Sequence, residues 1–145
     1  MTEPVARLSL VTLGVSDLAR STAFYEALGF RRRSRGADGV AFFEAGGVIL
    51  SLWPVEELVK DAEIAPSEPG RFRGMSLAWN CTSAEQVDLV LAKAVGTGGT
   101  LVRLARMVFW GGYTAYFADP DGHLWEVAHN PHFPFSEDGR LLLPD

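Results

Sequence analysis

The stretch LSLVTLGVSDLARSTAFYEALGF, residues 8–30, contains the first half of a unit that the chain repeats. Leu8–Val15 is rich in apolar and β-branched residues, which predicts a strand. Ser16-Asp17 is typical of a helix N-cap and Gly29 of a residue just past a helix end, so Leu18–Leu28 is predicted to be helical. The unit therefore starts as a strand followed by a helix.

Short apolar segments separated by glycine-containing turns follow this helix and predict three further strands, at Phe30–Arg35, Val40–Glu44 and Val48–Trp53. The second half of the chain repeats the same order. Its helix begins at a capping box formed by Ser83 and Gln86. Its predicted strands are Met75–Asn80, Thr100–Leu104, Tyr113–Ala118 and Leu124–His129. Both halves therefore predict the order β-α-β-β-β.

The repeat predicts one domain over residues 1–145, built from two small modules. A unit of about 60 residues or fewer cannot cover the far side of its own sheet well. We therefore expect an α+β fold of two paired βαβββ modules whose sheets pack or curl toward each other as a cup-shaped half-barrel. The predicted parts are a first module (7–54), a short helix at Val55–Ala62 within a linker (55–72), a second module (73–131) and a tail (132–145).

Composition excludes several classes of partner. The chain has 13 basic and 18 acidic side chains, a net charge of −5, which argues against nucleic-acid binding. The cluster Arg31–Arg35 is then a solvated strand edge. No apolar run approaches the ~20 residues of a membrane span. The start MTEPVARLSL lacks the positive charge of a signal peptide, so a cytoplasmic location is expected, and the lone Cys81 is expected to be buried.

Two segments resemble the vicinal oxygen chelate superfamily, which includes glyoxalase I, bleomycin-resistance proteins and extradiol dioxygenases. Val15-Ser16-Asp17-Leu18 with Phe24-Tyr25-x-x-Leu28-Gly29-Phe30 resembles its first strand–helix unit. Phe109-Trp110-Gly111-Gly112 with Phe117–Glu126 resembles its closing hairpin. Together with the repeat, the resemblance covers residues 7–131. It implies paired βαβββ modules, usually in a homodimer or an equivalent pseudo-dimer, with cup-shaped sites.

Metal-dependent members of the resembled superfamily place a His, Glu or Gln ligand on the first and last strands of each module. The resemblance aligns Leu10, Ser51, Met75 and Glu126 with these positions. Leucine cannot coordinate, and a thioether and a neutral hydroxyl are poor ligands for hard or borderline ions, so only Glu126 is a normal ligand. We therefore expect no metal site and no cofactor.

Three histidines near the C-terminus offer a second metal hypothesis. His129 and His132 have ligand-like spacing, and His123 precedes them. However, His123 and His129 share a strand face opposite to that of Glu126. We therefore interpret the three imidazoles as a partly exposed rim.

Period-two alternation assigns residues to the predicted cup. On the first strand, Val11, Leu13 and Val15 form the more continuous apolar side and are expected to meet the helix, so Leu8, Leu10 and Thr12 face the cup. Ile49, Leu124 and Ala128 belong to the same ring of cup-facing side chains. Aromatic residues around Trp110 are placed at its mouth. The candidate ligand-binding residues are Leu10, Thr12, Ser51, Trp53, Met75, Leu77, Trp79, Phe109, Trp110, Tyr113 and Glu126.

Glu126 is the candidate catalytic residue because a buried carboxylate must be paired, hydrogen-bonded or protonated. It pairs with Arg103 or Arg106, hydrogen-bonds to Ser51 or Thr12, or acts as an acid or base on a ligand. The sequence offers no obvious second catalytic group.

The preferred hypothesis is a metal-independent, homodimeric protein that holds a small aromatic or cationic organic molecule in an apolar cup. An alternative is a lyase, isomerase or dioxygenase of the same superfamily that uses Glu126 with a metal or as an acid–base group. A third is a module without a ligand that works through its dimer surface. The apolar tail Pro131–Asp145 is expected to wrap over the partner subunit or the cup.

Overall fold

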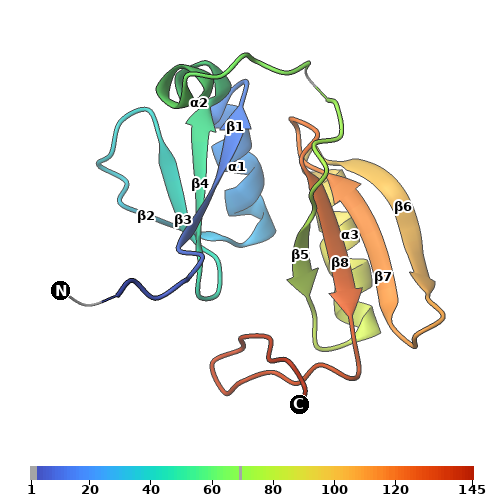
Figure 1. Cartoon of the computed structure of the whole chain (residues 1–145). Helices are drawn as coiled ribbons and strands as arrows, with labels where there is room; N and C mark the ends of the chain where they lie inside the picture. The colour runs from blue at the N-terminus through green and yellow to red at the C-terminus, as the bar shows by residue number, and fades with distance from the viewer. Residues whose placement is uncertain (1–2, 69) are drawn as a thin grey trace.

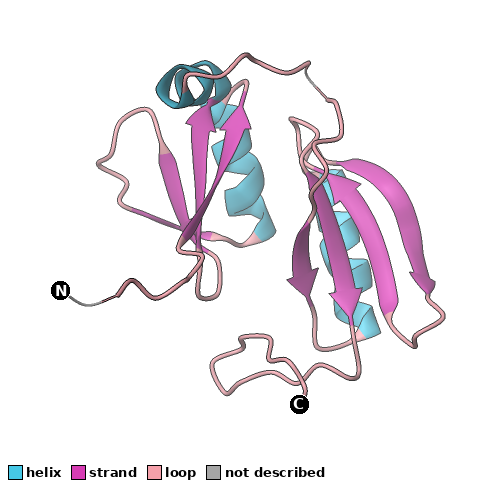
Figure 2. Cartoon of the chain, viewed as in Figure 1, coloured by secondary structure: helices cyan, strands magenta, loops and turns pink. Residues whose placement is uncertain are grey.

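The computed structural model describes residues 3–68 and 70–145 and contains two four-stranded mixed sheets with three α-helices (Figures 1 and 2). The first module consists of β1 (Leu10–Val15), α1 (Leu18–Leu28), β2 (Arg31–Arg33), β3 (Ala41–Glu44) and β4 (Ile49–Pro54). Helix α2 (Val55–Ala62) follows. The second module consists of β5 (Leu77–Asn80), α3 (Ala84–Gly96), β6 (Thr100–Met107), β7 (Tyr113–Ala118) and β8 (Leu124–His129).

The two sheets have the same topology, which confirms the predicted α+β fold and the repeat. Their strand orders are β1-β4-β3-β2 and β5-β8-β7-β6, and in each the first strand runs parallel to the last. The sheets are not closed into a barrel. Strand β6 continues to Met107, beyond the predicted end at Leu104.

The caps form where the sequence predicts them. The Asp17 side chain accepts a hydrogen bond from the backbone of Arg20 at 3.0 Å, and Gly29 ends α1 with a positive φ of 104°. The Ser83 hydroxyl accepts from the Gln86 backbone at 3.2 Å. These local interactions satisfy backbone groups that a helix end leaves without partners, and they fix where each helix begins.

The helix-facing sides of the two sheets share one core. Phe24 of α1 packs against Phe117 of β7 with ring centroids 6.3 Å apart, and Tyr25 packs against Trp125 of β8 at 6.0 Å. Helices α1 and α3 also touch each other. The buried apolar residues of this core are Leu13, Val15, Phe24, Tyr25, Leu28, Ala41, Phe43, Leu50, Leu52, Cys81, Val87, Leu91, Ala94, Ala115, Phe117, Trp125 and Val127.

This packing corrects the prediction that the two sheets of one chain form a cup between them. Large apolar side chains lie on the helix-facing side of each sheet, so burying those two sides against each other removes the most apolar surface from water. The other face of each sheet, here called its open face, therefore turns away from the shared core.

The two modules are also joined outside the core (Figure 1). Helix α2 packs against β1 and β4, and its side chains Val55 and Leu58 lie over Gly14. The chain then crosses to the second module, while the C-terminal tail lies at the opposite end of the molecule. In the described parts of the chain, no helix is long and apolar enough to span a bilayer.

Candidate functional site

The open face of the second module carries a cluster of polar side chains around Glu126. The Tyr116 hydroxyl donates a hydrogen bond to Glu126 Oε2 at 3.1 Å. Arg103 donates to Thr114 Oγ1, and its guanidinium carbon lies 5.2 Å from the centre of the Tyr116 ring. Tyr116 of β7 lies directly opposite Glu126 of β8, so the pairing of the two strands brings these two side chains together.

Burial is the main cause that raises the pKa of Tyr116, and the Glu126 carboxylate raises it further while Arg103 opposes the change. Tyr116 therefore remains a hydrogen-bond donor at neutral pH. Within residues 3–68 and 70–145, Glu126 has no ion pair. The predicted ion pair with Arg103 or Arg106 is therefore wrong. In the same ranges the Glu126 side chain has no hydrogen bond to Ser51 or Thr12, and Arg103 lies near the carboxylate through the Tyr116 ring.

The open face of the first module is more apolar. In the parallel pairing of β1 and β4, Thr12 lies opposite Ser51, and Leu10 lies opposite Ile49. Ser51 is only 3% exposed, whereas Leu10 is 39% exposed. Trp53 lies beyond Ser51 on the same face and is half-buried. These positions agree with the predicted face of the first module.

The predicted face of β5 is wrong. Leu77 pairs in register with Trp125, while Ala78 pairs with Glu126, so Leu77 and Trp79 lie on the helix-facing side and not beside Glu126. The two N-caps, Asp17 and Ser83, show the cause. Val15 lies two residues before Asp17, and Cys81 lies two residues before Ser83, so these two correspond. By the same count Leu10 corresponds to Ser76, one position after the predicted Met75.

The remaining predicted ligand-binding residues, Met75 of the cup wall and the three mouth residues, do not gather at one place. Met75 is half-exposed, and Phe109 is fully exposed at the turn between β6 and β7. The Trp110 ring folds back over Gly112, where no Cβ would fit. Tyr113 lies on the helix-facing side and donates to Asp88 Oδ1 of α3 at 2.7 Å, a bond that raises its pKa. Tyr113 is therefore misplaced in the prediction.

The three histidines have separate environments, and His123 belongs to the turn before β8 that is described below. His129 Nδ1 lies 3.2 Å from the carbonyl oxygen of Cys81, and His132 is exposed. Cys81 is buried, as predicted, and burial raises the pKa of its thiol to about 11. Across the described ranges, no three His, Cys, Asp or Glu side chains are arranged to hold a metal ion.

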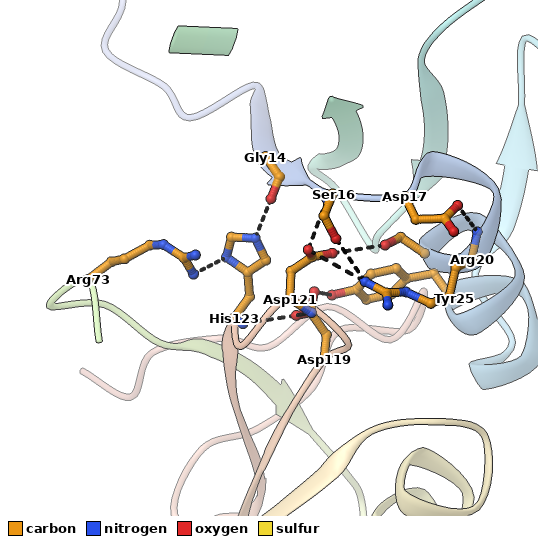
Figure 3. Close-up of polar contacts among 10 residues, drawn as sticks. Gly14, Ser16, Asp17, Arg20, Tyr25, Arg73, Asp119, Asp121 and His123 are labelled. Atoms are coloured by element: carbon orange, nitrogen blue, oxygen red, sulfur yellow. Dashed lines mark hydrogen bonds and ion pairs between the residues drawn. The ribbon is translucent and has the colours of Figure 1, made fainter. Parts of the chain in front are cut away.

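The turn before β8 joins the two modules, a role that the sequence did not reveal (Figure 3). The buried Asp119 accepts a hydrogen bond from the Tyr25 hydroxyl at 2.6 Å. Its other oxygen accepts from the backbone of Asp121 and of His123, both at 2.9 Å. Trp125 Nε1 donates to the Tyr25 hydroxyl at 3.0 Å. Burial, and then Asp119, raises the pKa of Tyr25 well above its ordinary value.

The next residues of the turn extend this joint (Figure 3). Asp121 accepts from the backbone of Ser16 at 2.9 Å and from the Ser21 hydroxyl at 3.1 Å, at the start of α1. His123 Nε2 donates to the carbonyl oxygen of Gly14 at 2.8 Å, and its Nδ1 accepts from Arg73 at 3.1 Å. The sequence predicts only a turn here, although the two carboxylates Asp119 and Asp121, two positions apart, are a signal of further bonding.

A family profile and several solved structures point to the same protein family. The sequence profile of the Glyoxalase/Bleomycin resistance protein/Dioxygenase superfamily matches residues 7–127. A crystal structure of a glyoxalase-related enzyme from Fulvimarina pelagi is 34% identical, with a TM-score of 0.88 over 97% of this chain and 100% of that chain. A glyoxalase/bleomycin resistance protein/dioxygenase from Nocardioides is 27% identical, with a TM-score of 0.71 over 88% of this chain and 85% of that chain.

A lactoylglutathione lyase from Agrobacterium tumefaciens shares the fold, with 22% identity and a TM-score of 0.65 over 88% of this chain and 96% of that chain. The comparison with curated proteins gave no match.

Proposed function

Because the chain belongs to the glyoxalase/bleomycin resistance protein/dioxygenase superfamily, we propose that it binds a small aromatic or cationic organic molecule in a cup completed by a second copy of itself. The open face of the second module of one copy would lie beside the open face of the first module of the other. The observation that carries the proposal is the Glu126 cluster, because it stands on the sheet face opposite to the one that packs against the helices and the other module.

The Glu126 carboxylate supports a cationic ligand. One of its oxygens accepts the Tyr116 hydrogen bond, and Arg103 is engaged with Thr114 and with the Tyr116 ring. A half-buried carboxylate without a cationic partner gains energy when a positively charged group binds beside it. The net charge of −5 favours the approach of such a molecule.

The first module supports the apolar side of the cup and the pairing of two copies. Its strand β1 is an edge strand, as is β5 in the second module, so both offer unpaired backbone groups. Leu10 and Ile49 are 39% and 44% exposed on the open face, and Leu8 is 71% exposed just before β1. A second copy would cover these side chains, and Trp53 would supply a flat ring on the same face.

The available donors support binding without a metal. The positions that correspond to metal ligands in the superfamily are Leu10, Ser51, Ser76 and Glu126, after the correction of β5. A hydrocarbon and two neutral hydroxyls contribute little to the coordination of a divalent ion, so one carboxylate remains. We therefore derive no reaction step that uses a metal, and the predicted absence of one remains a prediction.

Calorimetry with two matched dyes tests the role of Glu126. Thioflavin T is a cationic aromatic dye, and its uncharged benzothiazole analogue has nearly the same shape. We expect the Glu126→Gln variant to bind the cation about tenfold more weakly, because one charge-assisted contact is lost, and to bind the neutral analogue as before. Glu57→Gln, at an exposed position on α2, is the control for the change in net charge.

Light scattering of the same samples tests the dimer. A monomer at all concentrations together with failure to bind either dye would contradict the proposal. Turnover of the methylglyoxal–glutathione adduct, with or without added Ni²⁺ or Zn²⁺, would instead support the alternative of an enzyme that uses Glu126. A cytoplasmic location likewise stays a prediction, which fractionation of expressing cells would check.

A further inference from the structure

A cavity of about 570 Å³ lies between the two modules, and Glu126 is not among the residues that line it. Its walls come from three parts of the chain that are distant in sequence: the first module, strands β5 and β8, and the C-terminal tail. This volume is in the range of small-molecule pockets in proteins. The lining residues that matter most for a ligand are Phe30, Arg31, Trp79, Trp125, Phe135 and Leu141.

Aromatic rings and buried aliphatic side chains form the inner wall. The Phe30 ring lies 5.3 Å from the Trp79 ring and 5.8 Å from the Trp125 ring, centre to centre. Leu50 is 3% exposed and Leu28 is 5% exposed behind them. Phe30 and Trp79 are only half-buried, so part of each ring faces the cavity. Such rings accept the edge or face of another flat aromatic ring.

The tail forms the outer wall as a small hairpin of its own. Phe135 and Leu141 pair across it, and the backbone of Leu142 donates to the carbonyl oxygen of Pro134 at 2.8 Å. Arg140 reaches the first module, where a Cβ on Gly47 would lie 3.2 Å from its Cδ atom. The tail therefore bridges the modules, and its apolar side chains Phe135 and Leu141 face the cavity.

The charges at the rim favour an acidic group on the ligand. Glu44 is in an ion pair with Arg33 at 3.1 Å, and Arg140 is paired with Asp138 at 3.2 Å. Arg31 also lines the cavity, and in the described ranges it has no carboxylate within ion-pair distance. The guanidinium of Arg31 is thus the rim charge that a bound carboxylate or sulfonate would contact.

From the aromatic wall, the tail and the rim charge, we propose that this cavity is a second ligand site, which binds a planar aromatic molecule that carries an acidic group. It differs from the proposed cup in charge preference and does not include Glu126, although Ile49 borders both. Glu126 lies on the opposite face of its strand from Trp125, which lines the cavity, so the two sites can be tested separately.

Two fluorescent probes of matched shape test the site: 8-anilino-1-naphthalenesulfonate, an anion, and N-phenyl-1-naphthylamine, its uncharged analogue. We expect both to bind, with changes in the NMR signals of the indole N–H groups of Trp79 and Trp125. The corresponding signals of Trp53 and Trp110 should not move, because neither ring lines the cavity.

Exposed positions allow substitutions that spare the core. Arg31→Ala should weaken binding of the sulfonate probe about fivefold and leave binding of the neutral probe unchanged, because it removes only a charged contact. Arg35→Ala is the control, since Arg35 is paired with Glu26 and does not line the cavity. Leu141→Trp should fill the mouth and weaken both probes at least tenfold, whereas Leu143→Trp on the exposed end of the tail should change neither.

Three results would overturn the proposal: neither probe binds, the shifts fall on Trp53 or Trp110, or Leu141→Trp binds both probes like the unmodified chain. If Arg31→Ala weakened the binding of both probes equally, the preference for an acidic ligand would be contradicted. Because Glu126→Gln should leave both probes unaffected, failure here is distinguishable from failure of the proposed cup.

Discussion

Asp119 and Glu126 are two carboxylates of one hairpin with opposite environments. Asp119 is 2% exposed, and its carboxylate accepts three hydrogen bonds, from the Tyr25 hydroxyl and from the backbone N–H groups of Asp121 and His123. Glu126 is half-buried, and the structure gives it one such bond, from Tyr116. A fully buried carboxylate must have its bonding capacity used within the protein. The difference therefore separates a carboxylate that holds the modules together from one that is available to a ligand.

Removal of the buried carboxylate should have the largest effect. In Asp119→Ala, the Tyr25 hydroxyl and two backbone N–H groups lose their acceptor inside the joint. We expect the free energy of unfolding to fall by about 3–5 kcal/mol, the range for breaking a buried charged network. Urea denaturation measures the change. Asp61→Ala, at an exposed position on α2, is the control, and an equal, small loss in both variants would contradict a role for the joint.

The Tyr25 hydroxyl bridges Asp119 and Trp125, so its removal should have the next largest effect. Tyr25→Phe keeps the ring in the core but leaves the carboxylate and the indole N–H each without one partner. We expect a loss of about 1–3 kcal/mol in the free energy of unfolding at pH 7. Urea denaturation at this pH checks it, and an unchanged midpoint would contradict it.

The same variant has a defined pH dependence. Burial raises the pKa of Tyr25 well above its ordinary value in the folded chain, whereas an unfolded tyrosine ionises near pH ~10. Above that pH the unfolded state binds fewer protons, so this group's stabilising contribution falls by up to about 1.4 kcal/mol per pH unit. The stability difference between the unmodified chain and Tyr25→Phe should therefore shrink above pH ~10. A constant difference would contradict the coupling.

Glu126→Gln should have the smallest effect on stability. The amide oxygen of glutamine can still accept the Tyr116 hydrogen bond, and the side chain is only half-buried. We expect a change within about 0.5 kcal/mol in the free energy of unfolding, together with the weaker cation binding described above. A stability loss as large as that of Asp119→Ala would show that Glu126 belongs to the structural framework and would remove the contrast between the two carboxylates.

Much of the fold could be predicted because its signals are local. Helix caps such as Asp17 and Ser83 act on backbone groups a few positions away, and alternation placed Leu13 and Val15 on the helix-facing side of β1. The packing of the two sheets could not be predicted in this way. Alternation shows which residues share a face, but it does not show which face meets which.

The candidate site was predicted less well for the same reason. Glu126 and Arg103 were identified, but Tyr116, which links them, was missed because its place depends on the pairing of β7 with β8. Strand β5 is short, and its sequence does not show which alternate residues face the helix, so Leu77 and Trp79 were assigned to the wrong face. The joint at Asp119 depends on a contact with Tyr25, 94 positions earlier, which no local pattern contains.

The arrangement of the strand pairs has a consequence for the order of folding. Every strand pairing in the described chain lies within one module, so each sheet can form after closing loops of moderate length. The bond between Tyr25 and Asp119 closes a much longer loop and gains its strength only when both modules are in place. We therefore expect the joint to form late in folding, and interactions that form late mainly slow unfolding. On this expectation, the Asp119 turn lengthens the lifetime of the folded chain more than it speeds folding.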